Sequence, residues 1–363
     1  MERNYVAIDL HRRRSLILRQ NEHGEELGVV RIDNDPVALA AALAEAGPDP
    51  EVAIEATYGW YWAVDLLQAE GANVHLVNPS GLHWDTRRVK NDYKDCQGLA
   101  ARLRLGALPE AWIAPPAVRE LRELVRYRAK LVALRTGLKA QAKALLAKHG
   151  LHPPVDELWG PVGAAYLDQV ELPHGYTLRL ESLRDLVGAF DAEVAMLERE
   201  IFSWLKDDAG YWAIQAIEGV GRVMAAIFVA EIGDVSRFSS PQALCSWAGL
   251  TPKHHESDLK AHRGNVTKQG SKLVRWAAVE AVAHLRGGHK LQSDYRRLAE
   301  RRGRNIARVA AARKLLTRLL RPARRRDPMP RPGREGGVSR IGHSHGARSA
   351  SGMTPTCVAR STK

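Results

Sequence analysis

The first third of the chain sets short apolar runs among helix-forming segments in an order that few folds can accommodate. Runs rich in β-branched residues, bounded by polar turns, occupy 5–10, 15–20, 27–32, 51–56 and 73–78. Such runs predict strands, and the first three predict a meander. Helix-forming segments at 36–46 and 60–70 precede the last two runs. A meander followed by alternating helix and strand predicts a layered α/β domain.

Four acidic residues stand where such a domain could gather them. Asp9 lies near the end of the first run, Glu55 lies near the end of the fourth, and Asp92 and Asp95 open a further helical segment. A spacing of three places the last two on one helical face. They could instead simply favour the positive end of the helix dipole. If a helix crosses the strand ends, all four meet, and two Mg²⁺ ions about 3.5–4 Å apart would offset their repulsion.

The net charge of +13 suits a polyanionic partner, but it is unevenly spread. The segment 321–363 holds ten Lys and Arg against Asp327 and Glu335, so the rest of the chain is only mildly basic. Because this segment is rich in Arg, Gly, Pro and Ser and lacks periodicity, we expect a disordered basic tail. It either binds RNA or is an extension unrelated to the remaining sequence.

The cysteines and the N-terminus predict a reducing, cytoplasmic setting. Three isolated cysteines form no CxxC pair, which favours neither a disulfide framework nor a zinc site. The first residues contain no apolar signal segment, and no run approaches the eighteen or so apolar residues of a membrane span. We therefore expect a protein that is neither exported nor inserted in a membrane.

The middle of the chain predicts two long helices, at 118–148 and 178–205, separated by proline-containing breaks. In the second helix, apolar residues alternate in steps of three and four, at Leu180, Leu183, Val187, Phe190, Val194, Leu197 and Ile201. This spacing is typical of a coiled-coil seam. The seam could pack within one chain, as a helical hairpin, or between chains of a homo-oligomer.

A glycine-containing turn at 217–221 has the form of a helix-hairpin-helix. Gly219 and Gly221 would let backbone N–H groups approach a phosphate, and Arg222 follows directly. The alternative is a plain turn between two helices without a ligand. A backbone contact of this kind would carry no base information.

Ser257 lies in a polar stretch that we expect to be a loop between helices. Basic residues crowd around it, at Lys253, Lys260, His262, Arg263, Lys268, Lys272 and Arg275. Lys90 precedes the acidic helix in a similar way. These residues are candidates for positioning phosphates. His254 and His255 are better read as ordinary polar residues, because no third metal ligand lies at a recognisable spacing. Basic helices follow at 285–320, with packing positions expected at Tyr295, Ile306, Val309 and Leu315.

Two blocks of sequence resemble one protein family. The segments YVAIDLH, EATYGWYW, VNP and KNDYKDCQGLA resemble the RuvC-like, RNase H-fold DEDD domain of the insertion-sequence-110 family of transposases. The resemblance implies that Asp9, Glu55, Asp92 and Asp95 bind the metal. AGLTP, the following serine, R-G, T-K-x-G and Arg275 resemble the second block of that family, in which the serine links covalently to DNA. That residue is Ser257, although Asp258 follows it where the family usually has glycine.

The resemblance implies a domain plan and a reaction. The plan is a RuvC-like domain at 1–115, a helical coiled-coil connector at 116–210, a mostly α domain at 211–320 that carries the hairpin and the serine, and the tail. The reaction is the cutting and rejoining of insertion-sequence DNA, guided by a structured RNA, by a dimer or tetramer in the prokaryotic nucleoid. An alternative is a RuvC-like structure-specific or junction-resolving endonuclease that activates water. Another is a non-catalytic nucleic-acid-binding scaffold.

Overall fold

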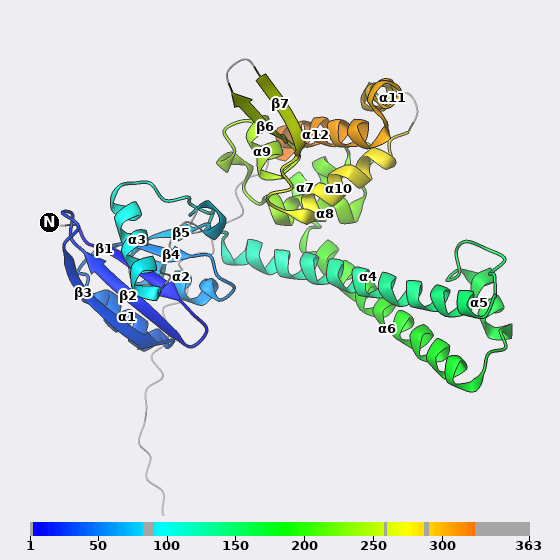
Figure 1. Ribbon diagram of the computed structural model, residues 1–363, viewed down its shortest axis with the longest axis horizontal. Helices are drawn as coiled ribbons and strands as arrows, with labels where there is room; N and C mark the ends of the chain where they lie inside the picture. The colour runs from blue at the N-terminus through cyan, green and yellow to red at the C-terminus, as the bar shows by residue number, and fades with distance from the viewer. Residues whose placement is uncertain (1–2, 83–90, 258–259, 287–289, 324–363) are drawn as a thin grey trace, which may run out of the picture. The chain divides into compact units, whose positions relative to one another are not determined.

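The computed structural model describes residues 3–82, 91–257, 260–286 and 290–323. The side chains of His255, Ser257, 260–263 and 321–323 lie outside this description. The chain forms two compact units, Met1–Glu120 and Leu121–Lys363 (Figure 1). The finer division into four parts remains a prediction. Among the described residues, no helix combines the length and the apolar character that crossing a membrane requires.

The first unit is built on a five-stranded mixed sheet in the order β3-β2-β1-β4-β5. Its strands are β1 (Tyr5–Leu10), β2 (Arg14–Gln20), β3 (Glu26–Asp33), β4 (Glu51–Glu55) and β5 (Asn73–Val77). The first three form an antiparallel meander, and β4 and β5 run parallel to β1. The predicted meander and the α/β class are confirmed, and the arrangement is consistent with a RuvC-like domain.

Helices cover both faces of this sheet. Helices α1 (Pro36–Ala44) and α2 (Trp60–Ala69) pack on one face, where Ile8 and Ile54 point, and α3 (Asp92–Arg104) packs on the other. On the α3 face the central strands present Ala7 and Ala53, whose small side chains let the helix approach closely. A short 3₁₀ turn, η1 (Pro79–Gly81), follows β5.

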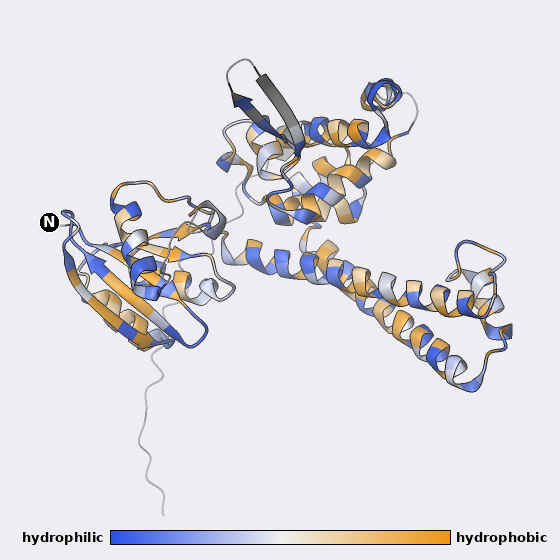
Figure 2. Cartoon of the chain, in the orientation of Figure 1, coloured by the Kyte–Doolittle hydropathy of each residue, from blue (hydrophilic) through white to orange (hydrophobic). Residues whose placement is uncertain are grey.

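The second unit opens with a long helical arm, in which α4 (Pro116–Lys148) and α6 (His174–Trp204) are joined through α5 (Pro161–Gln169). The predicted seam of α6 is buried against α4 of the same chain, with Val194 and Leu197 on Leu131. The pair between Arg128 and Glu198, at 2.6 Å, also joins the two helices. Hydrophobic residues recur along both helices of the arm in Figure 2. The seam therefore forms a hairpin within one chain, and an oligomer remains a prediction.

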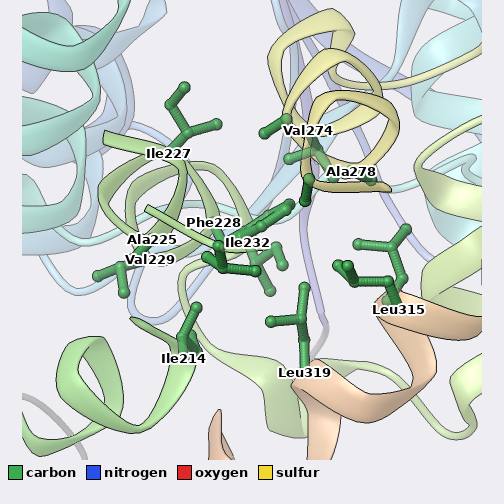
Figure 3. Packing of buried hydrophobic residues seen from close by; sticks show 14 of the residues in the cluster. Ile214, Ala225, Ile227, Phe228, Val229, Ile232, Val274, Ala278, Leu315 and Leu319 are labelled. Carbon is green, nitrogen blue, oxygen red and sulfur yellow. The ribbon is translucent and has the colours of Figure 1, made fainter. Parts of the chain in front are cut away.

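The rest of the second unit is a helical core with one small sheet. Its helices are α7 (Ala209–Gln215), α8 (Arg222–Ile232), η3 (Val235–Arg237), α9 (Pro241–Trp247), α10 (Lys272–Ala283), α11 (Lys290–Arg302) and α12 (Arg304–Ala323). Helix α8 is buried all round from Ala225 to Ile232. Phe228 lies among side chains of α7, α10 and α12 (Figure 3). Such burial on every side is typical of a central core helix.

Two expectations for this unit are wrong. The stretch around Ser257 is not a loop, because β6 (Pro252–Ser257) and β7 (Lys260–Val266) pair as an antiparallel β-hairpin. Its described side chains are largely exposed, so the sequence shows none of the apolar alternation that marks a half-buried strand. Ile306 is 58% exposed, whereas the next residue, Ala307, is fully buried. The buried face of α12 begins one residue later than the apolar pattern indicates.

Candidate active site

Strand register brings Asp9 and Glu55 to the same edge of the sheet. Ile8 and Ile54 are partners in the parallel pair β1/β4, and the two acids are the next residues on their strands. Since side chains alternate along a strand, both acids point to the face that carries Ala7 and α3. Asp9 is only 8% exposed. Two carboxylates from neighbouring strands are thus aimed under one helix.

Local capping fixes the start of α3. The side chain of Asn91 accepts a hydrogen bond from the Lys94 N–H at 2.8 Å, as an N-cap residue does. Asp92 and Asp95 follow in the first turn, where negative charge suits the helix dipole. Buried Leu99 and its neighbours anchor the helix on the sheet. The cap and the apolar face together hold the acidic turn over the end of β1.

His11 joins two of the acids. Its Nε2 lies 3.2 Å from Oδ2 of Asp9 and 3.4 Å from Oδ1 of Asp92. Ligand atoms of these three residues all lie within 4.8 Å of one another, close enough to surround one ion. On its other side, Oδ2 of Asp92 lies 3.7 Å from Nη2 of Arg31. Sequence reasoning missed His11, although its place two residues after a strand aspartate was a usable signal.

The electrostatics of the cluster favour an added positive charge. Burial raises the pKa of Asp9, the charges of Asp92 and Asp95 raise it further, and His11 partly opposes them. The same surroundings, burial first and the charge of Asp9 next, raise the pKa of Cys96 to about 12, so this thiol stays protonated. Carboxylate oxygens with a histidine nitrogen are donors that a divalent cation accepts. The residues therefore fit a divalent-cation site.

The four predicted acids are thus not all equally close to one another in the structure. It brings Asp9 and Asp92 together around His11. Asp95 lies near enough for its charge to act on Asp9. Glu55 is half-buried at the end of β4, on the same face of the sheet. The assignment of all four as metal ligands remains a prediction.

Ser257 is the last residue of β6, where it pairs with Lys260, the first residue of β7. Lys253, Lys268 and Lys272 are exposed around this hairpin. The side chains of Ser257 and Arg263, and Lys90 and Asp258 entirely, lie outside the described residues. An exposed β-hairpin rimmed by lysines is a surface that a polyanion can reach.

Comparison with known proteins identifies both units. Residues 6–150 match the DEDD transposase profile of the IS110 type, and residues 212–296 match the profile described as Transposase IS116/IS110/IS902 family. The chain belongs to the IS110 family of transposases. A probable family 20 transposase of Pseudomonas aeruginosa is 28% identical, over 75% of this chain and 83% of its own length.

Other relatives of this transposase are more distant or more partial. The transposase for insertion sequence element IS1328 of Yersinia enterocolitica is 25% identical, over 85% of this chain and 93% of its own length. The pilin gene-inverting protein of Moraxella lacunata is 28% identical, over 52% of this chain and 66% of its own length. The likeness to the IS1328 transposase thus spans nearly the whole of that protein.

In the transposase, two of the candidate nucleic-acid-binding arginines make contacts within the protein itself. The Arg275 guanidinium donates to the carbonyl oxygens of Ala248, Gln269 and Gly270, at 2.5 to 3.2 Å. Burial lowers its pKa. The Arg222 guanidinium stacks 3.9 Å from the centre of the Phe202 ring. Carbonyl oxygens and rings of the same chain thus already engage both arginines.

The glycine turn 217–221 also packs against the protein. Gly219 has a positive φ of 84°, and a Cβ there would lie 2.2 Å from the carbonyl oxygen of Ala281 on α10. Glu218 accepts a hydrogen bond from the backbone N–H of Arg286 at 2.7 Å. Gly221 is the N-cap residue of α8, with open space around it. The close approach that requires Gly219 is therefore to α10, and phosphate binding at this turn remains a prediction.

Proposed function

We propose that this transposase cuts and rejoins the DNA strands of its insertion sequence with Ser257 as nucleophile and with Mg²⁺ held by Asp9, Glu55, Asp92 and Asp95. The observation that carries the proposal is the convergence of Asp9, His11 and Asp92 at the sheet edge where β4 brings Glu55. When bound, the cations would neutralise charge on the phosphate and favour the serine alkoxide.

The chain's own residues account for the remaining steps. The Ser257 oxygen attacks phosphorus, a serine–phosphate bond forms, and the bond to the leaving DNA oxygen breaks. A DNA hydroxyl then attacks the same phosphorus and releases the serine. Because each step exchanges one phosphoester for another, rejoining needs no ATP, in keeping with a sequence that lacks a GxxxxGK[ST] loop. Lys253, Lys268 and Lys272 hold the strand beside the β-hairpin.

The finer context of the reaction follows from the family resemblance. A structured guide RNA would pair with target and donor DNA, and a dimer or tetramer of the chain would assemble on both, in the nucleoid of a prokaryotic cell. In that case Ser257 of one chain can act at the acidic metal site of the same chain or of another chain.

A denaturing gel tests the proposal. End-labelled element-junction DNA is incubated with the protein, the adjacent noncoding transcript and Mg²⁺. We expect a protein-linked DNA band with the wild-type protein and none with Ser257→Ala or with Asp9→Ala. A Ser257→Ala protein that still forms the band would remove this serine from the mechanism.

A second function rests on a specific observation. Asp258 follows Ser257, where its negative charge would oppose both serine ionisation and phosphate approach. The acidic site alone could activate water, as in a RuvC-like structure-specific or junction-resolving endonuclease. Cleaved DNA without a protein-linked band, formed equally well by Ser257→Ala, would establish this alternative.

A further inference from the structure

The positive charge of the described chain is concentrated in one helical pair. The 289 residues before α11 hold 34 Lys and Arg against 37 Asp and Glu, whereas residues 290–320 hold ten against two. Helices α11 and α12 therefore supply the basic excess of the chain up to Leu320. Figure 2 shows α11 almost wholly in hydrophilic colours.

The pair is held by its apolar side and by one acidic residue. Leu291 of α11 and Leu315 of α12 are buried in the common core. Asp294 accepts from Lys314 at 2.9 Å and from Arg297 at 3.2 Å. These contacts account for two of the basic side chains and set the two helices against each other.

The turn between the helices carries three further arginines, Arg301, Arg302 and Arg304, which we call the arginine turn. All three are exposed, and among the described residues no carboxylate forms an ion pair with them. Gly303 between them has a φ of 86°, which lets the chain reverse sharply. They lie C-terminal to both family-matched segments.

Helix stability explains only part of this cluster. Arg301 and Arg302 stand in the last turn of α11, where the dipole favours positive charge. Arg304 opens α12, where the dipole opposes it, and the first turn of α12 holds no acidic residue. Three like charges within four residues also repel one another. The fold therefore presents positive charge here at some expense to itself, which an external anion would offset.

We propose that the arginine turn binds the sugar–phosphate backbone of duplex DNA. The proposal rests on the DNA-strand chemistry inferred above and adds to it the surface that would hold the duplex. Four consecutive residues span at most about 11 Å. Each DNA strand carries one charge per about 3.4 Å of helix axis, so successive phosphates can meet all three side chains. Backbone contact predicts binding that is sensitive to salt and indifferent to sequence.

The test measures binding of the full-length protein to labelled duplexes of element-end and scrambled sequence, and to a structured RNA, over a salt series without Mg²⁺. The triple variant Arg301→Gln/Arg302→Gln/Arg304→Gln is compared with Lys130→Gln/Lys148→Gln/Arg199→Gln. The control residues are exposed on α4 and α6, and their substitution removes the same amount of positive charge. Circular dichroism melting verifies that both variants fold.

We expect the arginine-turn variant to bind both duplexes more weakly by the same factor, with a log–log salt slope smaller by about 2–3. The control should match the wild type. Equal weakening of both variants, or no change in either, would overturn the assignment, and so would a loss confined to RNA. Failure of the wild-type protein to bind any duplex would overturn the proposed DNA chemistry as well, which keeps the two failures distinct.

Discussion

The acidic edge of the first unit, formed by Asp9, Glu55, Asp92 and Asp95, and the β6–β7 hairpin of the second unit differ in burial. Asp9 lies within the buried stretch 6–10 of β1, and Asp92 starts a capped helix packed on the same sheet. The β6–β7 hairpin has two strands, and its described side chains are largely exposed. An isolated two-stranded hairpin is only marginally stable. The acids therefore lie in a buried frame, whereas the serine-bearing hairpin lies on the surface.

This difference has an energetic side. The buried frame holds Asp9 where its pKa is raised by burial and by neighbouring acids, so the ionised cluster stores repulsion that a cation relieves. The β-hairpin stores no comparable penalty among its described side chains, because they face solvent. Substitutions at the acidic edge should consequently change stability and activity together, while those in the β-hairpin should change activity alone.

The largest effect is expected from Ser257→Ala. Loss of the nucleophile should reduce strand transfer by at least about 10⁴-fold, the scale seen when a catalytic nucleophile is removed. The melting temperature and its rise with Mg²⁺ should match those of the wild type, because the acidic edge is intact. Both are measured by differential scanning fluorimetry beside a strand-transfer assay. A variant that loses the Mg²⁺ response would show that the two regions are not independent.

Gly219→Ala tests whether the second unit outside its β-hairpin is as constrained as the sheet. The new Cβ would meet the carbonyl oxygen of Ala281 on α10 at a positive φ. We expect unfolding free energy to fall by about 2–4 kcal/mol in urea titrations. Gly221→Ala, at an open position with negative φ, is the matched control and should stay within about 1 kcal/mol. Similar stability of the two variants would contradict the packing of this turn.

Phe190→Asp tests whether α4 and α6 pack against each other within one chain. Phe190 packs beside Leu131 and Val194, so the charge should destabilise the arm by about 1–3 kcal/mol and leave the solution mass unchanged. Leu186→Asp, on the exposed side of α6, should change neither the stability nor the solution mass. The measurements are urea unfolding and light scattering. A drop in mass without loss of stability would instead assign the seam to a contact between chains.

The smallest effect is expected on the free energy of unfolding of the metal-free protein when Asp9 is replaced by Asn. Because the folded-state pKa of Asp9 is raised, ionisation weakens the fold as pH rises from the unfolded-state pKa through the folded-state value. The amide removes that penalty, so the variant should gain less than about 1 kcal/mol at neutral pH and lose the gain in acid. Its response to Mg²⁺ should vanish. In the wild type, Mg²⁺ affinity should rise with pH as the Asp9 proton is lost.

A destabilised Asp9→Asn protein at neutral pH would contradict the stored repulsion. The measurement is thermal melting across a pH series, with calorimetric titration of Mg²⁺ at each pH. Asp33→Asn, an exposed acid at the end of β3, serves as the control for loss of one negative charge.

The sequence was sufficient where burial leaves a pattern. Strands β1 and β4 alternate between two covered faces, so their bounds and the meeting of Asp9 with the acidic helix could be anticipated. The β6–β7 hairpin could not, because an exposed ribbon needs no apolar period. His11 was missed because its role comes from two acids far apart in the chain.

The arginines teach a related lesson. Arg275 binds three backbone carbonyl oxygens, and no residue type in the sequence marks such partners. In the sequence it is indistinguishable from Arg301, which is exposed. Charge density alone therefore indicates a basic region, and only the fold separates arginines that hold the protein together from those that face solvent.

The most direct test of the account is to locate the DNA-linked residue. Wild-type protein is reacted with element-junction DNA and Mg²⁺, digested with nuclease and protease, and sequenced by tandem mass spectrometry. The account predicts a nucleotide-bearing peptide modified at Ser257 that disappears in Asp9→Ala. Modification at any other residue, or cleaved DNA with an unmodified Ser257 peptide, would contradict it.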